Sequence, residues 1–218
     1  STEEVYVEQD IFDEFVSELS TRIKNIKSGD SDDDDLGPII TPETKDKINN
    51  HINELKDSCS TIQGINRGGD KYIAPTIIID PPESARIVNE ETFGPVMSVR
   101  PFSNEDELIQ KIHKTGYGLS SSIFGSNKSR INQIIKRIKT GNVNVNDVMT
   151  SYAIPTLPYG GEGISGLGKQ HGIEGLRSLC RIKSVVVNRF NFINEPMWWG
   201  RPKIVEKILK KATNFLYK

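Results

Sequence analysis

The stretch that decides the fold is residues 96–124, VMSVRPFSNEDELIQKIHKTGYGLSSSIF. Residues 96–99 are a short apolar run that includes two valines, which favours a β-strand. Residues 105–113 place apolar side chains at helical spacing, and residues 120–124 predict a second strand. A strand, a helix and a strand in this order are typical of an α/β domain.

The same alternation extends outward in both directions. Further strands are predicted at residues 5–7, 73–79, 142–148 and 181–190. Further helices are predicted from Asp10 to about Lys27, from Thr41 to about Cys59, at 130–139 and at 203–218. Asp10 and Thr41 stand where N-caps are expected, and Gly29 is expected to end the first helix. The sequence therefore predicts an α/β fold, with a largely parallel sheet flanked by helices.

Composition excludes several classes of protein. The formal net charge of the 218 residues is -1, which argues against a dedicated nucleic-acid binder. Two cysteines are too few for a disulfide framework, which favours a reducing compartment, so we expect a cytoplasmic protein. No apolar run approaches the roughly 20 residues that span a bilayer.

Four consecutive aspartates, Asp32–Asp35, form the most acidic run of the chain. Adjacent acids cannot all face one ion, because loops that bind a metal space their ligands along the chain. A solvated loop is therefore favoured over a cation site. We predict no metal site.

Five segments in register resemble the aldehyde dehydrogenase superfamily. They are EETFGPV (90–96), KTGYGLSSSIF (114–124), TGNVNVND (140–147), the glycine-rich run from Pro158 to Leu176, and KSVVV (183–187). Residues 5–15 also resemble the sequence that follows the nucleophile of that family. The glycine segment with Leu179-Cys180 and an extended tail most resembles a fungal and plant subgroup with a C-terminal extension.

The resemblance implies a domain of the aldehyde dehydrogenase catalytic type and an enzyme that oxidises an aldehyde to a carboxylic acid with NAD or NADP. It places the nucleophilic Cys, the Glu base and most of the Rossmann-type domain upstream of Ser1. The chain is then the C-terminal catalytic-domain portion of such an enzyme, inactive alone, and no catalytic residue is assigned within it. Cys59 and Cys180 are expected to be structural, because thiols of this kind are among the most buried residues.

Three side chains match cofactor and substrate positions of the family. Glu91 matches the glutamate that accepts hydrogen bonds from the hydroxyls of the nicotinamide-side ribose, and Phe93 matches the aromatic beside the nicotinamide ring. Without the resemblance Glu91 would be an exposed loop charge and Phe93 a core residue. Tyr159 matches an aromatic, usually Phe, of the aldehyde pocket, with a packed loop aromatic as an equal alternative. Asn146 is expected to be structural.

The C-terminal part divides into a strand and an extension. The strand at about 181–190, centred on Lys183–Asn188, matches the one that joins family members into a homodimer or homotetramer. Residues 1–190 are assigned to the catalytic-domain portion and 191–218 to the extension. Residues Trp198–Lys218 comprise two tryptophans followed by a basic amphipathic helix. This pattern is compatible with contact with an intracellular membrane surface and also with docking of the helix on protein. The competing hypothesis is a non-catalytic remnant that only oligomerises and contacts membranes.

Overall fold

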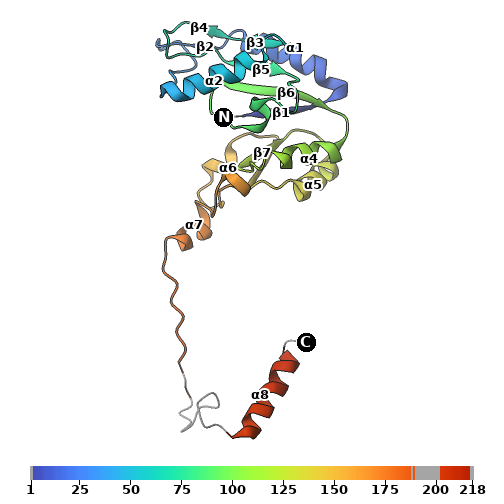
Figure 1. The fold of residues 1–218 in the computed structure, drawn as a ribbon, viewed down its shortest axis with the longest axis vertical. Coiled ribbons are helices and arrows are strands. Elements are labelled where there is room, and N and C mark those ends of the chain that lie inside the picture. The colour runs from blue at the N-terminus through green and yellow to red at the C-terminus, as the bar shows by residue number, and fades with distance from the viewer. Residues whose placement is uncertain (1, 188, 190–201, 217–218) are drawn as a thin grey trace. The chain divides into compact units, whose positions relative to one another are not determined.

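Figure 1 shows the fold in a computed structural model, which describes residues 2–187, 189 and 202–216. Contacts between residues divide the chain into two compact units, residues 1–179 and residues 180–218. The α/β fold that was predicted is confirmed in the first unit, where helices alternate with strands along the chain.

The main sheet of the first unit has four strands in the order β1-β6-β5-β3. They span Glu4–Glu8 (β1), Val96–Phe102 (β6), Thr76–Ile79 (β5) and Thr61–Gln63 (β3). β1 and β5 run parallel to β6, and β3 runs antiparallel to β5. In this register Val5 lies opposite Val99, so the first strand of the chain pairs with one that follows some ninety residues later.

The sheet buries a separate apolar cluster on each of its two faces, because side chains along a strand alternate between faces. Ile77 of β5 packs in a cluster with residues of α1 (Phe12–Ile23). The next residue, Ile78, packs in a cluster with Ile48 and Leu55 of α2 (Pro42–Leu55). Both isoleucines have no solvent exposure. The two helices therefore cover opposite faces of the sheet.

Two small parallel pairs of strands and several short helices complete the first unit. The pairs are β2 (Lys27–Ser28) with β4 (Ile65–Asn66), and β7 (Ser120–Ile123) with β8 (Asn142–Val145). The helices are α3 (Arg86–Asn89), α4 (Glu105–Lys114), α5 (Lys128–Arg137), α6 (Thr150–Ala153) and α7 (Gly172–Ser178), with 3-10 turns at Gln9–Ile11 and Gly163–Ser165. The strand–helix–strand order over residues 96–124 is thus confirmed as β6, α4 and β7.

The boundaries of the first two helices differ from the prediction. Asp10 lies inside a 3-10 turn and does not cap α1, which begins at Phe12 and ends at Ile23 instead of Lys27. Lys27 pairs in β2, so the chain has left the helix before Gly29. Thr41 caps α2 as predicted, since its hydroxyl accepts a hydrogen bond from the Thr44 amide. This helix ends at Leu55, before Cys59.

The strand predicted at 181–190 is wrong for the single chain: residues 181–187 form neither helix nor strand, and positions 188 and 190 lie outside the described residues. A strand requires a hydrogen-bonded neighbour, and none of the described strands pairs with this segment. The predicted tail helix is confirmed as α8 (Lys203–Leu216). Among the helices that the structure describes, none is long and apolar enough to cross a membrane.

Candidate functional site

The loop between α3 and β6 carries two of the three predicted site residues. Glu91 and Phe93 are exposed, and 72% of Phe93 is accessible to solvent, whereas Thr92 between them is fully buried. The loop is thus anchored through its middle residue and presents the residues on either side. Phe93 is therefore not part of the core, and its role beside the nicotinamide stays a prediction.

A carboxylate from the start of the chain fixes the backbone of this loop. The Thr92 amide donates to one carboxylate oxygen of Glu3 at 2.9 Å, and the Phe93 amide donates to the other at 3.1 Å. Hydrogen bonds to an ionised acceptor are about twice as strong as neutral ones. Glu3 therefore holds two successive peptide groups in one orientation.

A buried histidine fixes the loop from the side of α2. His51, of which 1% is exposed, has its Nδ1 3.1 Å from the Thr92 hydroxyl, and its Nε2 lies 3.5 Å from a carboxylate oxygen of Glu90. Burial lowers the pKa of His51, and the Glu90 carboxylate opposes that shift only in part. The imidazole is therefore neutral near pH 7. Lys47, one turn earlier, donates its ammonium to the Glu91 carbonyl.

The backbone of Phe93 adopts a left-handed conformation with a φ of 57°. For a residue with a Cβ this conformation costs about 1–2 kcal/mol. Such strain persists where the surroundings impose it, and it concentrates at ligand clamps and active sites. The strained residue is also the exposed aromatic, which is the combination expected of a side chain held ready for a ligand.

A turn at residues 116–118 contacts both this loop and the glycine-rich segment. The Glu91 amide donates to the Tyr117 hydroxyl at 3.4 Å. The Gly118 amide donates to the Ser165 hydroxyl at 2.9 Å, and the Gly118 carbonyl accepts from the Glu162 amide. The two segments that carry the predicted site residues are therefore joined through one turn.

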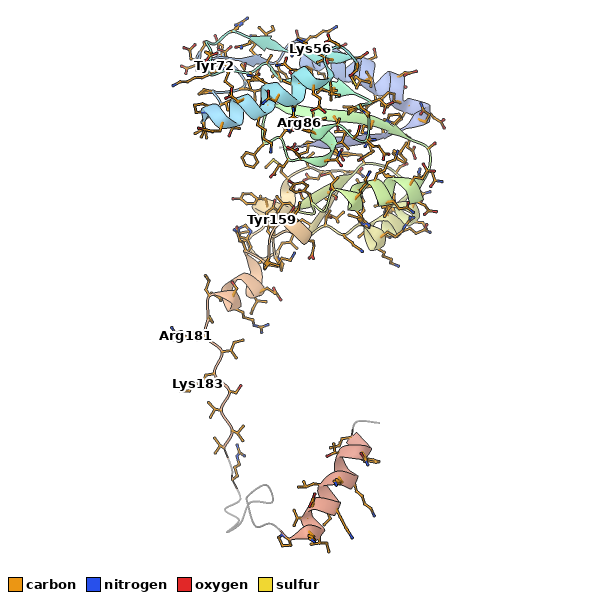
Figure 2. The ribbon with its side chains drawn as sticks, in the orientation of Figure 1. Lys56, Tyr72, Arg86, Tyr159, Arg181 and Lys183 are labelled. Carbon is orange, nitrogen blue, oxygen red and sulfur yellow. The ribbon has the colours of Figure 1, made fainter. Side chains whose placement is uncertain are left out.

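Tyr159 lies in a small aromatic cluster on the glycine-rich segment (Figure 2). Its ring meets that of Tyr152 edge-on, with centroids 5.2 Å apart, and that of His171 at 6.4 Å. Its backbone exchanges two hydrogen bonds with Gln170. Tyr159 is half-buried and packed, so the loop-aromatic and the pocket interpretations both stay compatible with its surroundings.

The paired glycines beside Tyr159 are required by close backbone contacts. A Cβ on Gly160 would lie 2.4 Å from the Gly168 carbonyl oxygen, and one on Gly161 would lie 2.4 Å from that of Ser165. Lys169 donates to the Gly160 carbonyl at 3.0 Å and lies 3.3 Å from the Glu162 carboxylate. The segment is thus compact despite its irregular backbone.

Asn146 has a structural role in this chain. Its side-chain amide donates to the Gly125 carbonyl and accepts from the Gly125 amide, at 3.0 and 2.8 Å. These bonds tie the residue after β8 to the second residue after β7, and they explain why Asn146 tolerates a φ of 54°.

The two cysteines differ in their surroundings. Cys59 is half-buried and packs against the cluster around Ile48. Cys180 is exposed, so burial gives no support to the structural role expected of it. No group of three or more potential ligands places a metal ion among the residues that the structure describes. Asp34 and Asp35 accept hydrogen bonds from the amides of Ser31 and Lys27.

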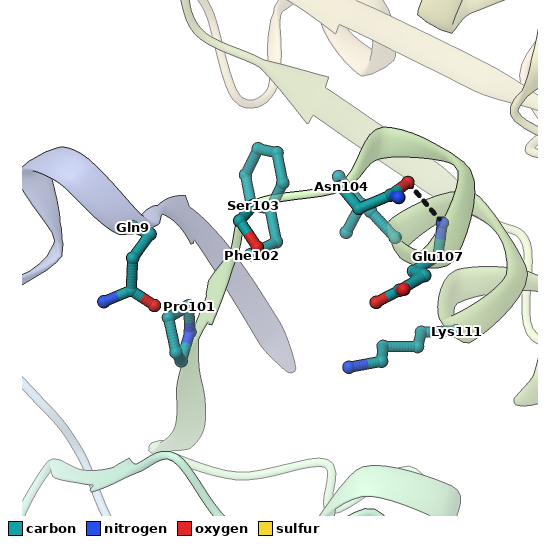
Figure 3. A pocket seen from close by; sticks show the side chains of 8 residues that line it. Gln9, Pro101, Phe102, Ser103, Asn104, Glu107 and Lys111 are labelled. Carbon is teal, nitrogen blue, oxygen red and sulfur yellow. Dashed lines mark hydrogen bonds between the residues drawn. The ribbon is translucent and has the colours of Figure 1, made fainter.

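A cavity of about 100 Å³ lies away from all three predicted site residues (Figure 3). It opens where β1 and β6 end and α4 begins, and its lining includes Gln9, Asn104 and Lys111. The Asn104 side chain is engaged in capping α4 through the amides of Asp106 and Glu107. The cavity lining contains none of the residues for which a cofactor role was predicted.

Sequence reasoning assigned no role to the residues that hold the loop. Glu3, His51 and Tyr117 lie far apart along the chain, and only Tyr117 falls within a segment that resembles the family. Only the spacing of polar residues within apolar runs could have marked His51, which faces the core from the middle of α2.

Comparison with known proteins identifies the family. The family model for the aldehyde dehydrogenase family matches residues 1–185. Among curated relatives, a 2-aminomuconic 6-semialdehyde dehydrogenase from Pseudomonas is 33% identical over 85% of this chain and 40% of its own length. A betaine aldehyde dehydrogenase from Brucella melitensis is 34% identical over 84% of this chain and 39% of its own length.

Solved structures show the same relationship. An aldehyde dehydrogenase from Bacillus cereus superposes with a TM-score of 0.77 at 28% identity, over 85% of this chain and 38% of that one. A betaine aldehyde dehydrogenase from Staphylococcus aureus, solved in complex with NAD+, gives 0.71 at 31% identity, over 81% and 37%. The fold and these matches define a domain of the α/β class. The chain belongs to the aldehyde dehydrogenase family.

The chain spans about two fifths of the length of the curated relatives that it matches. These relatives are bacterial, so they give no support to the predicted fungal and plant subgroup.

Proposed function

We propose that this chain supplies the nicotinamide-side part of the cofactor site in an NAD(P)-dependent aldehyde dehydrogenase, which oxidises an aldehyde to a carboxylic acid. One observation carries the proposal: the loop at residues 90–94 is fixed through Thr92 and exposes Glu91 and the strained Phe93. The catalytic-domain portion would comprise residues 1–190, with an extension at 191–218.

The residues of the loop fit a dinucleotide chemically. The Glu91 carboxylate has two oxygens, and it can accept a hydrogen bond from each of two neighbouring ribose hydroxyls. The exposed ring of Phe93 offers an apolar face next to that position, where it would shield the nicotinamide from water. The bound cofactor would supply the acceptor for the hydride that leaves the substrate. The aldehyde would contact Tyr159.

Cys59 is a poor candidate for the nucleophile of this reaction. A thiolate nucleophile needs a partly exposed, electropositive site beside donors for an oxyanion. Cys59 packs against the apolar cluster of α2 and its Sγ lies 3.8 Å from the Ser58 hydroxyl. We therefore propose that the chain by itself binds dinucleotide weakly and does not turn over aldehydes.

The test is to express the chain, record NAD+ and NADP+ binding by saturation-transfer NMR, and assay oxidation of a panel of aldehydes. Glu91→Gln should weaken transfer to the ribose protons on the nicotinamide side, because an amide offers one acceptor where the carboxylate offers two. Glu18→Gln, an equal change of charge at an exposed position of α1, is the matched control. Equal transfer in all three chains would refute the assignment of Glu91. Turnover that is lost in Cys59→Ser would refute the account of the cysteines.

A second function is favoured by the second unit. Val185, Val186 and Val187 are exposed in a segment without secondary structure, so they would form a homodimer or homotetramer by pairing with a strand of another subunit. Residues 203–216 of α8 place apolar side chains on one face and four lysines opposite. That helix suits an anionic membrane surface, and with it a peripheral location in the cytoplasm.

Light scattering and vesicle flotation test this second function separately. Val186→Lys should lower the molar mass of an oligomer, whereas Gln133→Lys, which adds the same charge at an exposed position of α5, should not. Vesicles of phosphatidylserine and phosphatidylcholine should carry the chain upward in a gradient, and Ile208→Glu should abolish that flotation. A monomer that stays at the bottom of the gradient would contradict both roles.

A further inference from the structure

We propose that Glu3 is the positioning residue of the loop at residues 90–94: its carboxylate sets the conformation in which Glu91 and Phe93 meet the cofactor. This inference rests on the proposed function for the identity of the ligand. The conformational part of it stands on the contacts of Glu3 alone.

The first step is the two-pronged contact. Each carboxylate oxygen of Glu3 accepts one amide, from Thr92 at 2.9 Å and from Phe93 at 3.1 Å. The backbone torsions of Thr92 set the relative direction of these two amides, and the left-handed φ of Phe93 follows directly after the second amide. The carboxylate therefore holds the backbone immediately before the strained residue.

The second step is the anchoring of Glu3 itself. Its carbonyl accepts a hydrogen bond from the Ser98 amide at 3.0 Å, just ahead of the paired residues of β1 and β6. The side chain then reaches from this anchored backbone to the loop that precedes β6. Glu3 thus links the loop to the sheet, and its half-buried side chain has little room to change conformation.

The third step is the opposite face of the loop, which leaves no other conformation open. Thr92 is fully buried with its hydroxyl beside His51. A Cβ on Gly94 would lie 2.4 Å from the Cδ1 of Ile48, so the backbone runs directly against α2. Held between Glu3 and α2, the loop keeps Glu91 and Phe93 exposed.

The nature of the contact requires a carboxylate. A glutamine at position 3 has nearly the same shape, but it offers one carbonyl oxygen and one NH2 group. Its NH2 group would face one of the two amide donors. Glu3→Gln therefore breaks at least half of the contact without opening a cavity.

The test combines hydrogen exchange with cofactor binding on the chain as it exists. In Glu3→Gln, protection of the Thr92 and Phe93 amides should fall about tenfold or more, because hydrogen bonds to charged groups are lost. Protection of Ile77 and Ile78 in β5 should stay unchanged, and Glu18→Gln should alter neither. Saturation transfer to the nicotinamide-side ribose of NAD+ should fall as it does in Glu91→Gln.

Each outcome decides one part of the inference. Unchanged protection of the two amides in Glu3→Gln would overturn the contact, whatever NAD+ does. Lost protection with unchanged NAD+ binding would overturn the positioning role. If the unsubstituted chain binds no NAD+, the proposed function fails and the loop conformation is judged by exchange alone.

A direct measurement covers the case in which Glu3→Gln does not fold. In the unsubstituted chain, scalar couplings across the hydrogen bonds should connect the amide nitrogens of Thr92 and Phe93 with the side-chain carboxyl carbon of Glu3. Their absence, in a spectrum where couplings across the backbone hydrogen bonds of β1 and β6 are resolved, would overturn the proposal.

Discussion

Replacement of Phe93 by alanine should barely change the stability of the chain, although the residue is a large aromatic. With 72% of Phe93 exposed, roughly 50 Å² of its surface is covered. At about 25 cal/mol per Å² this burial is worth about 1 kcal/mol. The left-handed strain stays, because alanine carries a Cβ too. The free energy of unfolding should therefore fall by about 1 kcal/mol, while saturation transfer to the nicotinamide ring of NAD+ is lost.

Phe12 provides the matched comparison, because it is the same residue type with 8% exposure. It packs with Val7, Ile77 and Val99 beneath α1, and its replacement by alanine should cost about 3–5 kcal/mol. Urea denaturation followed by far-ultraviolet circular dichroism measures both variants. A loss above about 2.5 kcal/mol for Phe93→Ala would refute the reasoning, since it would mean that the ring belongs to the core.

Three further predictions follow from the contacts described. Burial lowers the pKa of His51, so as the pH falls this histidine is protonated in the unfolded chain before it is protonated in the folded chain. The free energy of unfolding should therefore fall as the pH drops below the ordinary histidine pKa of about 6.5. Denaturation at pH 7.5 and 5.5 should show a smaller fall in His51→Gln, and an equal fall would contradict this. Thr41→Ala should cost about 1 kcal/mol through the lost cap of α2, whereas Asn53→Ala, exposed on the same helix, should cost nothing. Lys169→Met should cost about 0.5–1.5 kcal/mol, because the Gly160 carbonyl loses this donor and keeps the side-chain amide of Asn142. Exchange at the Gln170 amide should accelerate with it, and unchanged exchange there would show that the bond is unimportant.

Local sequence patterns predicted the helices and strands that depend on interactions between residues close together along the chain. Thr41 followed by Pro42 marks the start of α2 because a hydroxyl cap and a proline in the first turn act within four residues. The alternation in β8 and the helical spacing in α4 and α5 are signals of the same kind. These elements were predicted to within a few residues.

Contacts between distant residues set the rest, and no local pattern encodes them. α1 ends at Ile23 because Lys27 pairs with Ile65, some forty residues later. The segment 181–187 has a strand-like composition, but nothing among the described strands pairs with it. The resemblance supplied Glu91 and Phe93 as site residues, whereas Glu3 and His51 could be found only from the structure.

The pairing of β1 with β6 has a consequence for the order of folding. The contact between Glu3 and Thr92 closes a loop of about ninety residues, and long-range closures of this kind are late and slow events. The loop at residues 90–94 therefore reaches its final shape only when the first strand has docked beside β6. In a refolding experiment followed by pulsed hydrogen exchange, the Thr92 amide would become protected together with Val5 and Val7, and after the amides within α2.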